Sequence, residues 1–336
     1  MANNNTIKAS VLMPAYNDAR YIRDAIDSIL DQTFKDFELI IVNDGSTDET
    51  SQILSNYTDP RIRVINHPEN RGRACARNTA LETARGEYVL WMDADDISMP
   101  RRLEKQIAFM EMHPDISVVG GRVQCFHGSD KLLTYDYDHR AIKNTLLFGS
   151  PIPNSASCLR LSDIRSMDAV YDTKLTRAQD YDFWCQLLLD HKAKAANLPD
   201  LLLLYRVTIF TDKVYHTEVQ RRILKRLGID ADEAMLQQCF EMGTILPRES
   251  LSFSIDSYRK TSLKIIAANK KKNIFAQQEL EIRIFNRLAT LIIYSVPGLF
   301  LQLSSLIKML GYKYFFICGA KFFSKSLKKH LHRVFK

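Results

Sequence analysis

The sequence has few cysteines, and none of them are grouped as a metal site requires. No CxxC pair occurs, and no cysteine and histidine cluster has zinc-ligand spacing. The six cysteines are scattered: Cys75, Cys125, Cys158, Cys185, Cys239 and Cys318. This pattern excludes a zinc module and predicts a protein of a reducing, cytoplasmic compartment.

Two familiar phosphate-binding loops are also missing. No GxGxxG follows the first predicted strand, and GxxxxGK[ST] occurs nowhere in the chain. Dehydrogenases of the dinucleotide-binding type and P-loop nucleotide triphosphatases are therefore excluded.

Long uninterrupted apolar runs are absent as well. Met1 to Thr6 is polar and lacks the basic and then apolar pattern of a secretory signal, so we expect the body to stay in the cytosol. The most apolar stretch, Leu288 to Leu310, is broken by Pro297 and Gly298 and contains Gln302 and Lys308, so it is a poor membrane span.

Acidic residues are absent from the C-terminal part of the chain. The 336 residues carry a net charge of +7, and no Asp or Glu follows Glu281. The basic residues that follow it are Arg283, Arg287, Lys308, Lys313, Lys321, Lys325, Lys328, Lys329, Arg333 and Lys336. Because the excess charge lies in this tail, we expect one end to dock on an anionic surface, and we expect no nucleic-acid partner.

The segment Lys321 to Lys336 places apolar side chains on one helical face and lysines largely on the other. This pattern is typical of a helix that lies on anionic lipid. Alternatively, Leu288 to Cys318 forms a helical hairpin packed on the body or a surface that binds a partner.

Strands and helices alternate along the first 112 residues. Ile7 to Met13 reads as a buried strand stopped by Pro14, and Ser46 with Glu49 reads as a capping box that opens a helix. Further strands are predicted at residues 37–42, 61–65 and 88–92, and helices at 18–30, 74–84 and 100–112. This alternation predicts an α/β fold with a mostly parallel sheet covered by helices on both faces.

Chemistry-bearing residues follow the predicted strands. Ligands bind beyond the carboxyl ends of such strands, where Pro14, Asp44 and Asp93 lie. Asp93 and Asp95 offer hard oxygen ligands for Mn²⁺ or Mg²⁺ on a diphosphate, although an Asp-x-Asp triplet alone is more often a solvated loop. Asp44 can accept hydrogen bonds from a base or ribose with Tyr16 beside it, or it can serve only the turn.

Basic residues crowd the start of the third predicted helix, where they favour phosphate. These are Arg71, Arg73 and Arg77, for which a solvated helix face is the alternative. Beyond Gly121 the pattern loosens, with a strand near residues 155–160, a helix near 180–190 and a strand at 201–205, and we expect this half to face the acceptor. His67, His113 and the other histidines form no cluster and receive no role.

Five motifs in this order resemble family 2 glycosyltransferases over about the first 210 residues: PAYN at 14–17, VNDGSTD at 42–48, NRGRACARN at 70–78, GEYVLWMDADD at 86–96 and QDYDFW at 179–184. The resemblance implies the GT-A fold, a nucleotide-sugar donor that is usually a UDP-sugar, and inversion at the anomeric carbon. It places a GT-A domain at residues 1–215, with a nucleotide-sugar half at 1–120 and an acceptor half at 121–215. A helical region with the basic tail follows at 216–336.

The resemblance also implies roles for single residues. Asp44 contacts the uracil, Asp93 the ribose or sugar, and Asp95 the metal that bridges the diphosphate, with Asp96 as a weaker candidate behind them. Asp180 matches the general base, and its alternative is an acid that stabilises a helix N-terminus. The sequence departs from the pattern at Gln179, where Glu is common, and at Thr208, where His is common, while Arg206 remains as a donor-binding cation.

These observations favour an inverting glycosyltransferase on the cytoplasmic face of the plasma membrane, acting on a glycan or lipid-linked acceptor of a surface polysaccharide. Two alternatives stay open: a metal-dependent nucleotidyltransferase, which needs similar carboxylates, and a non-catalytic, membrane-docked scaffold of the same fold.

Overall fold

The structure is a computed structural model that describes residues 7–207, 213–244 and 254–295. The chain divides into two compact units, Met1–Leu146 with Ser150–Val219 and Leu147–Gly149 with Gln220–Lys336. The predicted basic helix at Lys321 to Lys336, and most of the apolar stretch before it, lie outside the described residues.

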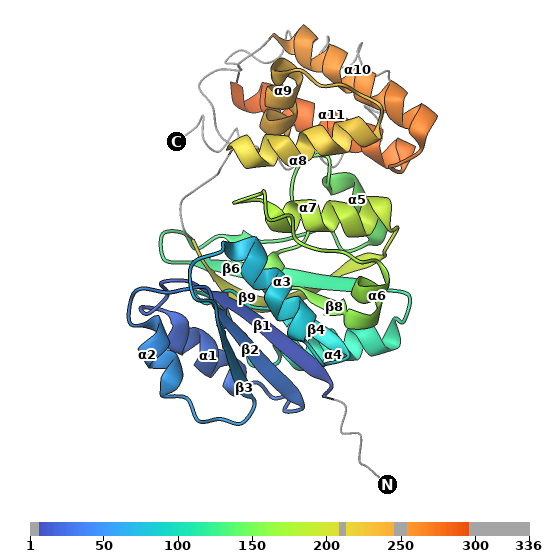
Figure 1. The fold of residues 1–336 in the computed structure, drawn as a ribbon. Helices are drawn as coiled ribbons and strands as arrows, with labels where there is room; N and C mark the ends of the chain where they lie inside the picture. Colours follow the sequence, from blue (N-terminus) through green and yellow to red (C-terminus); the bar gives the residue numbers. More distant parts are fainter. Residues whose placement is uncertain (1–6, 208–212, 245–253, 296–336) are drawn as a thin grey trace, which may run out of the picture. The chain divides into compact units, whose positions relative to one another are not determined.

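The first unit is built on one mixed sheet, which holds nine strands within the described residues. The strands are β1 (Ala9–Ala15), β2 (Phe37–Asn43), β3 (Ile62–Asn66), β4 (Tyr88–Trp91), β5 (Ile97–Ser98), β6 (Val118–Phe126), β7 (Leu132–Leu133), β8 (Cys158–Arg160) and β9 (Ala195–Arg206). Their order is β3-β2-β1-β4-β8-β6-β9-β5, with β7 beside β6 (Figure 1). The pairs from β3 to β4 are parallel, as are β6 and β9, whereas β8 is antiparallel to both of its neighbours.

Helices cover both faces of this sheet, as the alternation of strands and helices predicted. In the first unit they are α1 (Ile22–Leu30), α2 (Thr50–Ser55), α3 (Arg73–Thr83), α4 (Arg102–Met112), α5 (His139–Thr145), α6 (Leu161–Ser166) and α7 (Gln179–Cys185). The apolar stripes of α1 and α4 share a core with Val11 and Met13 of β1. Leu12 points to the opposite face because side chains alternate along a strand, and α3 packs there across β1 and β2 (Figure 1).

Pro14 does not stop the first strand, contrary to the sequence prediction. It lies inside β1 and is paired in register with Val42 of β2. Backbone bonds alternate along the strand: Leu12 O accepts from Met92 N on the β4 side, and Ala15 O accepts from Asp44 N on the β2 side. The missing N–H of Pro14 therefore faces the β4 side, where strand pairing has already ended, so no ladder hydrogen bond is lost.

The capping box predicted at Ser46 is also wrong. Helix α2 begins at Thr50, whose backbone N donates to Asp48 Oδ1 at 2.9 Å. The Ser46 hydroxyl instead accepts from the backbone N of Asn17 at 3.0 Å, and Asn17 Oδ1 accepts from Thr47 N at 2.8 Å. These contacts tie the loop after β1 to the loop after β2, which fixes the edge where both strands end.

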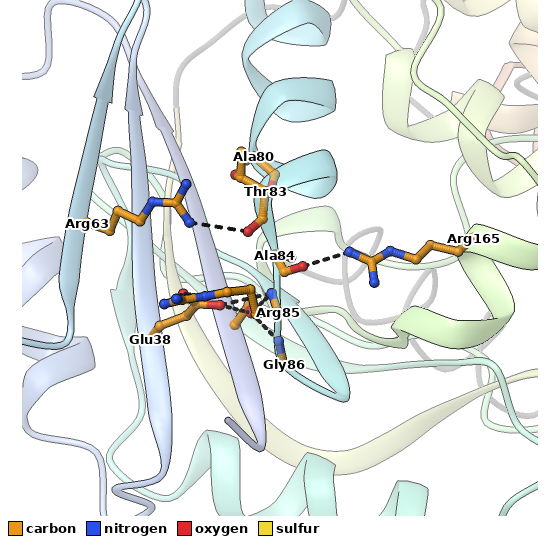
Figure 2. A network of polar contacts seen from close by, with 9 residues as sticks. Glu38, Arg63, Ala80, Thr83, Ala84, Arg85, Gly86 and Arg165 are labelled. Carbon is orange, nitrogen blue, oxygen red and sulfur yellow. Dashed lines mark hydrogen bonds and ion pairs between the residues drawn. The ribbon is translucent and has the colours of Figure 1, made fainter. Parts of the chain in front are cut away.

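A polar network holds the other end of the sheet. Glu38 is buried, and its carboxylate accepts from the Ser10 hydroxyl at 2.7 Å and from Arg85 Nη2 at 2.7 Å (Figure 2). Burial would raise the pKa of Glu38, but the hydrogen bonds from Arg85 and Ser10 hold it below its ordinary value. A Cβ at Gly86 would come within 2.5 Å of the Ala9 backbone, so only glycine allows this close approach.

The second unit is helical within the described residues. After α8 (Lys213–Arg226), which runs into it from the first unit, it contains α9 (Glu233–Thr244), α10 (Ile255–Lys272) and α11 (Gln277–Ser295). Asn269 links the last two helices, because its side chain accepts from Phe275 N and donates to Phe275 O. None of the helices in the described part of the chain has the length and apolar character that a bilayer crossing requires.

Candidate active site

A pocket of about 520 Å³ lies at the carboxyl ends of β1, β2 and β4. β2 and β3 lie on one side of β1 in the sheet, and β4, the next strand along the chain, lies on the other side. The order of strands in the sheet therefore reverses direction at β1. Such reversals are where open α/β sheets bind ligands. Residues from the start of α3, from the loop before α7 and from the end of β9 complete the lining: Gly72, Arg73, Ala76, Thr176, Arg177 and Tyr205.

The pocket gathers five of the residues that the sequence assigned to donor and metal binding. Pro14, Tyr16, Asp44, Asp93 and Asp95 all line it. Four other predicted residues stand outside the lining: Arg71, Arg77, Asp180 and Arg206. The contacts of each residue explain this division.

Asp93 is held by side chains from two other elements. Arg77 Nη2 lies 3.3 Å from one carboxylate oxygen, and the Ser155 hydroxyl donates to the other at 2.6 Å. Burial would raise the pKa of Asp93, but the guanidinium groups of Arg77 and Arg73 and the Ser155 hydrogen bond lower it below its ordinary value. Asp93 is therefore a charged and fixed acceptor.

Arg77 supports Asp93 and does not reach into the pocket. Its side chain is 3% exposed and lies between the rings of Trp91 and Tyr171, at 5.9 Å and 5.4 Å from their centroids. Its Nη1 also approaches Oε1 of Gln179 at 3.4 Å. The sequence placed Arg77 on a phosphate, whereas the structure buries it beneath the carboxylate.

Asp95 and Asp18 are two carboxylates of the pocket wall whose pKa values are both raised. Burial, followed by the charge of Asp93, raises the pKa of Asp95 to about 6. Burial also raises the pKa of Asp18 to about 6. A hydrogen bond from the Tyr16 backbone lowers this pKa, and the charge of Asp95 raises it further. Asp18 was not among the site residues predicted from the sequence, although it follows the PAYN motif directly.

Arg206 braces the backbone beside these carboxylates. Its Nε donates to Asp95 O at 2.9 Å, and its backbone N donates to Asp96 Oδ1 at 2.8 Å. The guanidinium lies 3.9 Å from the ring centroid of Tyr21. Asp96 is fully buried, and burial together with the charges of Asp93 and Asp95 raises its pKa well above the ordinary value. Arg206 thus holds the Asp95 loop in place, and Asp96 contributes by accepting from the Arg206 backbone.

Asp44 lies in a hydrogen-bond cradle at the other side of the pocket. It accepts from the backbone N of Arg71 at 3.0 Å and from that of Gly72 at 2.9 Å. His67 Nδ1 lies 2.6 Å from the same Oδ1 that Arg71 reaches. The contact of Arg71 with Asp44 is therefore through its backbone, and His67, to which the sequence gave no role, also contacts Asp44.

Arg73 is the cation that lines the pocket among the three arginines predicted near phosphate. It is exposed and is the first residue of α3. One turn separates it from Arg77, so the same helix provides an exposed cation at its start and a buried one behind it. Sequence spacing alone could not separate these two positions.

Asp180 is the second residue of α7 and is half-buried. The preceding Ala178 has a left-handed backbone, φ 55°, which is uncommon for alanine and orients the start of this helix. Asp180 is close enough to contribute to the electrostatic environment of Arg77, Tyr171 and Tyr205. Its carboxylate therefore lies near the Asp93 side of the site without lining the pocket.

The donor set suits a hard divalent cation. Asp18, Asp93 and Asp95 line one pocket, and two of them have raised pKa values because they are buried near other carboxylates. A dication relieves this repulsion, and carboxylate oxygen is the preferred ligand of Mg²⁺ and Mn²⁺. Within the described ranges, no group of three His, Cys, Asp or Glu side chains is placed so that it could hold a metal ion by itself.

Comparisons with known proteins identify the family of the chain. Residues 10–161 match the profile of glycosyl transferase family 2. An uncharacterized glycosyltransferase of Methanocaldococcus jannaschii is 34% identical over 207 residues, covering 59% of this chain and 70% of that one. The Escherichia coli UDP-Glc:alpha-D-GlcNAc-diphosphoundecaprenol beta-1,3-glucosyltransferase WfgD is 29% identical, covering 59% and 77%.

The fold has solved counterparts. S. aureus TarS 1-349 in complex with UDP has a TM-score of 0.55 and 26% sequence identity, covering 90% of this chain and 89% of that one. The sheet topology and the solved neighbours define the GT-A fold. The chain belongs to glycosyltransferase family 2, which confirms the family, the fold and the enzyme class that the five motifs predicted.

Proposed function

We propose that this glycosyltransferase moves a sugar from a UDP-sugar to a hydroxyl of a glycan or lipid-linked acceptor, with inversion at the anomeric carbon. The observation that carries the proposal is the pocket itself, which joins Asp44 to the Asp93 and Asp95 carboxylates across the carboxyl ends of β2 and β4. Asp44 on one side of the pocket can accept a hydrogen bond from a base, and Asp93 and Asp95 on the other side can hold a metal that binds the diphosphate. These two sides match the two ends of a nucleoside diphosphate. The UDP complex of TarS supports the choice of nucleotide.

The nucleotide contacts follow from the lining. Tyr16 is 44% exposed and lies beside Asp44, so its ring can cover the face of a base while Asp44 accepts from the edge. Arg73 is placed to pair with phosphate oxygens. Asp93, fixed by Arg77 and Ser155, serves as an acceptor for ribose or sugar hydroxyls.

The metal proposal rests on Asp95, with Asp93 as a second ligand and Asp18 as a neighbour. A bound Mn²⁺ or Mg²⁺ would offset the negative charge that gathers on the leaving diphosphate. Other residues hold both carboxylates in position: Arg206 contacts the Asp95 backbone, and Arg77 and Ser155 contact the Asp93 side chain.

We assign the proton transfer to Asp180. The acceptor hydroxyl attacks C1 of the donor sugar, its proton passes to the Asp180 carboxylate, and the bond from C1 to the diphosphate oxygen breaks on the opposite face. Gln179 instead of Glu before this aspartate has a structural reason here: it faces Arg77, which is already paired with Asp93, so a neutral acceptor suffices.

We also propose a class of acceptor. The name of WfgD describes a diphosphoundecaprenol acceptor, and we propose a similar lipid-linked acceptor at the cytoplasmic face of the plasma membrane. We further propose that the basic residues of Lys321 to Lys336 dock the enzyme on anionic lipid.

Flotation with anionic liposomes tests this docking. A chain truncated before Lys321 should lose binding to the liposomes, and equal flotation of the truncated and full-length chains would refute the proposal.

A nucleotide panel tests the activity. UDP-, GDP- and dTDP-sugars are offered with Mn²⁺, Mg²⁺ or chelator, and binding is followed by thermal shift while released products are identified. Binding of a UDP-sugar with release of UDP supports the proposal. Release of pyrophosphate from a nucleoside triphosphate and a sugar phosphate would support the nucleotidyltransferase alternative, and binding of none would favour the scaffold.

A further inference from the structure

His67 lies directly behind Asp44 and takes no part in the proposed transfer. It follows β3, and its backbone N donates to Asn43 O at 2.9 Å, which fixes it against the end of β2. Its ring is 8% exposed and contacts Asp44 through Nδ1 and the Thr79 hydroxyl through Nε2, the latter at 3.1 Å. Residues from β3, β2 and α3 therefore form one chain of polar contacts that ends at the pocket.

The hydrogen bonds to Asp44 leave one acceptor position open. A carboxylate has about four lone-pair positions. His67 and the Arg71 backbone occupy the two positions on Oδ1, and the Gly72 backbone occupies one on Oδ2. Because Asp44 lines the pocket, the remaining position on Oδ2 is the one that a ligand can reach.

A single acceptor distinguishes between bases. Uracil and thymine present one ring N–H between two carbonyl groups, which matches one acceptor position. Guanine presents two neighbouring N–H donors that call for both oxygens of a carboxylate, and Oδ1 is already filled. Cytosine presents a ring nitrogen that is itself an acceptor, and its donor is the neighbouring exocyclic amino group, so donation to Asp44 brings the lone pair of the ring nitrogen toward the same carboxylate.

We propose that His67 is a positioning residue whose Nδ1 contact holds Asp44 so that one oxygen selects the ring N–H of a uracil-type base. This inference rests on the proposed UDP-sugar donor and assigns its base selectivity to a histidine outside the pocket lining. His67 does not touch the nucleotide, and its effect passes entirely through the orientation of Asp44.

A matched pair of variants tests this role. In His67→Asn the side-chain amide nitrogen takes the place of Nδ1 and can still donate to Asp44, while the contact to Thr79 is lost. In His67→Gln the amide nitrogen takes the place of Nε2, so the Thr79 contact is kept and the donation to Asp44 is lost. Each variant removes one buried contact, so a purely structural role would affect both alike, which thermal unfolding checks.

The measurement is the Kd of UDP, GDP and CDP for each full-length protein, together with kcat and KM for the UDP-sugar. We expect His67→Gln to weaken UDP binding roughly tenfold or more, because a hydrogen bond to a charged group is lost, and to reduce the preference for UDP over CDP. The KM should rise with little change in kcat, and His67→Asn should recover most of the affinity.

Equal losses in the two variants, or no loss in His67→Gln, would overturn the positioning role while leaving the UDP-sugar proposal intact. Tighter binding of GDP than of UDP by the wild-type protein would overturn the single-acceptor argument. Failure of the wild-type protein to bind any nucleotide would overturn the proposed function and this inference together.

Discussion

Replacing Asp95 with asparagine should stabilise the metal-free protein while removing metal-dependent donor binding. Burial and the neighbouring charge of Asp93 raise the pKa of Asp95 from 3.8 to about 6. A shift of about 2 units corresponds to roughly 3 kcal/mol of unfavourable charge in the folded state. Because Asp95 is half-buried, solvent screening reduces this to about 1–2 kcal/mol.

The pH dependence has a definite sign. The folded-state pKa of Asp95 is raised, so the folded protein binds more protons than the unfolded chain between about pH 4 and pH 6. The free energy of unfolding of the wild-type protein therefore falls as pH rises through this range. Above about pH 6, Asp95 causes no further change with pH. Asp95→Asn lacks that fall, so its advantage should be full at pH 8 and nearly absent at pH 4.

The assay is thermal unfolding in chelator at pH 4, 6 and 8, and then with added Mn²⁺. For a unit of this size the expected gain is roughly 3–6 °C in Tm at pH 8. Mn²⁺ with UDP should raise the Tm of the wild-type protein and leave that of Asp95→Asn nearly unchanged. An asparagine variant with no gain at pH 8 in chelator would refute the view that unrelieved carboxylate repulsion makes this a metal site.

Three further changes test separate parts of the argument. Asp180→Asn should cut kcat by about 10²–10⁴ while the Kd of UDP changes little, and unchanged turnover would remove Asp180 as the base. Glu38→Gln should lower the free energy of unfolding by about 1–3 kcal/mol at pH 7. Since the folded-state pKa of Glu38 is lowered from 4.5, this difference should shrink as pH falls below about 4, and a constant difference would refute the ion-pair account. Gly86→Ala should cost about 1–3 kcal/mol, read by denaturant unfolding, because its Cβ would overlap the Ala9 backbone.

The first half of the fold was predictable because each signal was local and repeated. β2 and β4 are mostly apolar runs, so the sequence pattern placed each strand within one residue, whereas α1 has one apolar stripe but begins four residues later than predicted. The side chains after these strands meet at one edge of the sheet, which is why the sequence alone could group Asp44, Asp93 and Asp95.

The second half was less predictable because its order comes from distant pairing. β6 is a nine-residue strand in the interior of the sheet, yet it contains Gly120 and Gly121, which disfavour strands in isolation. Each glycine is explained by a neighbour from far along the chain: a Cβ at Gly120 would meet Asn197, and one at Gly121 would meet Leu202, within 2.4 Å. A local pattern cannot report such constraints.

A raised pKa does not by itself identify a ligand of the metal. Asp95 and Asp96 are adjacent in sequence, and burial raises the pKa of both. Asp95 lines the pocket, whereas Asp96 is fully buried and accepts from the Arg206 backbone. A cation in the pocket can therefore offset the negative charge of Asp95 directly. Asp96 instead accepts a hydrogen bond from Arg206, which holds the Asp95 loop in place. Both residues lie in the turn between β4 and β5, where one carboxylate lines the pocket and the next is buried behind it.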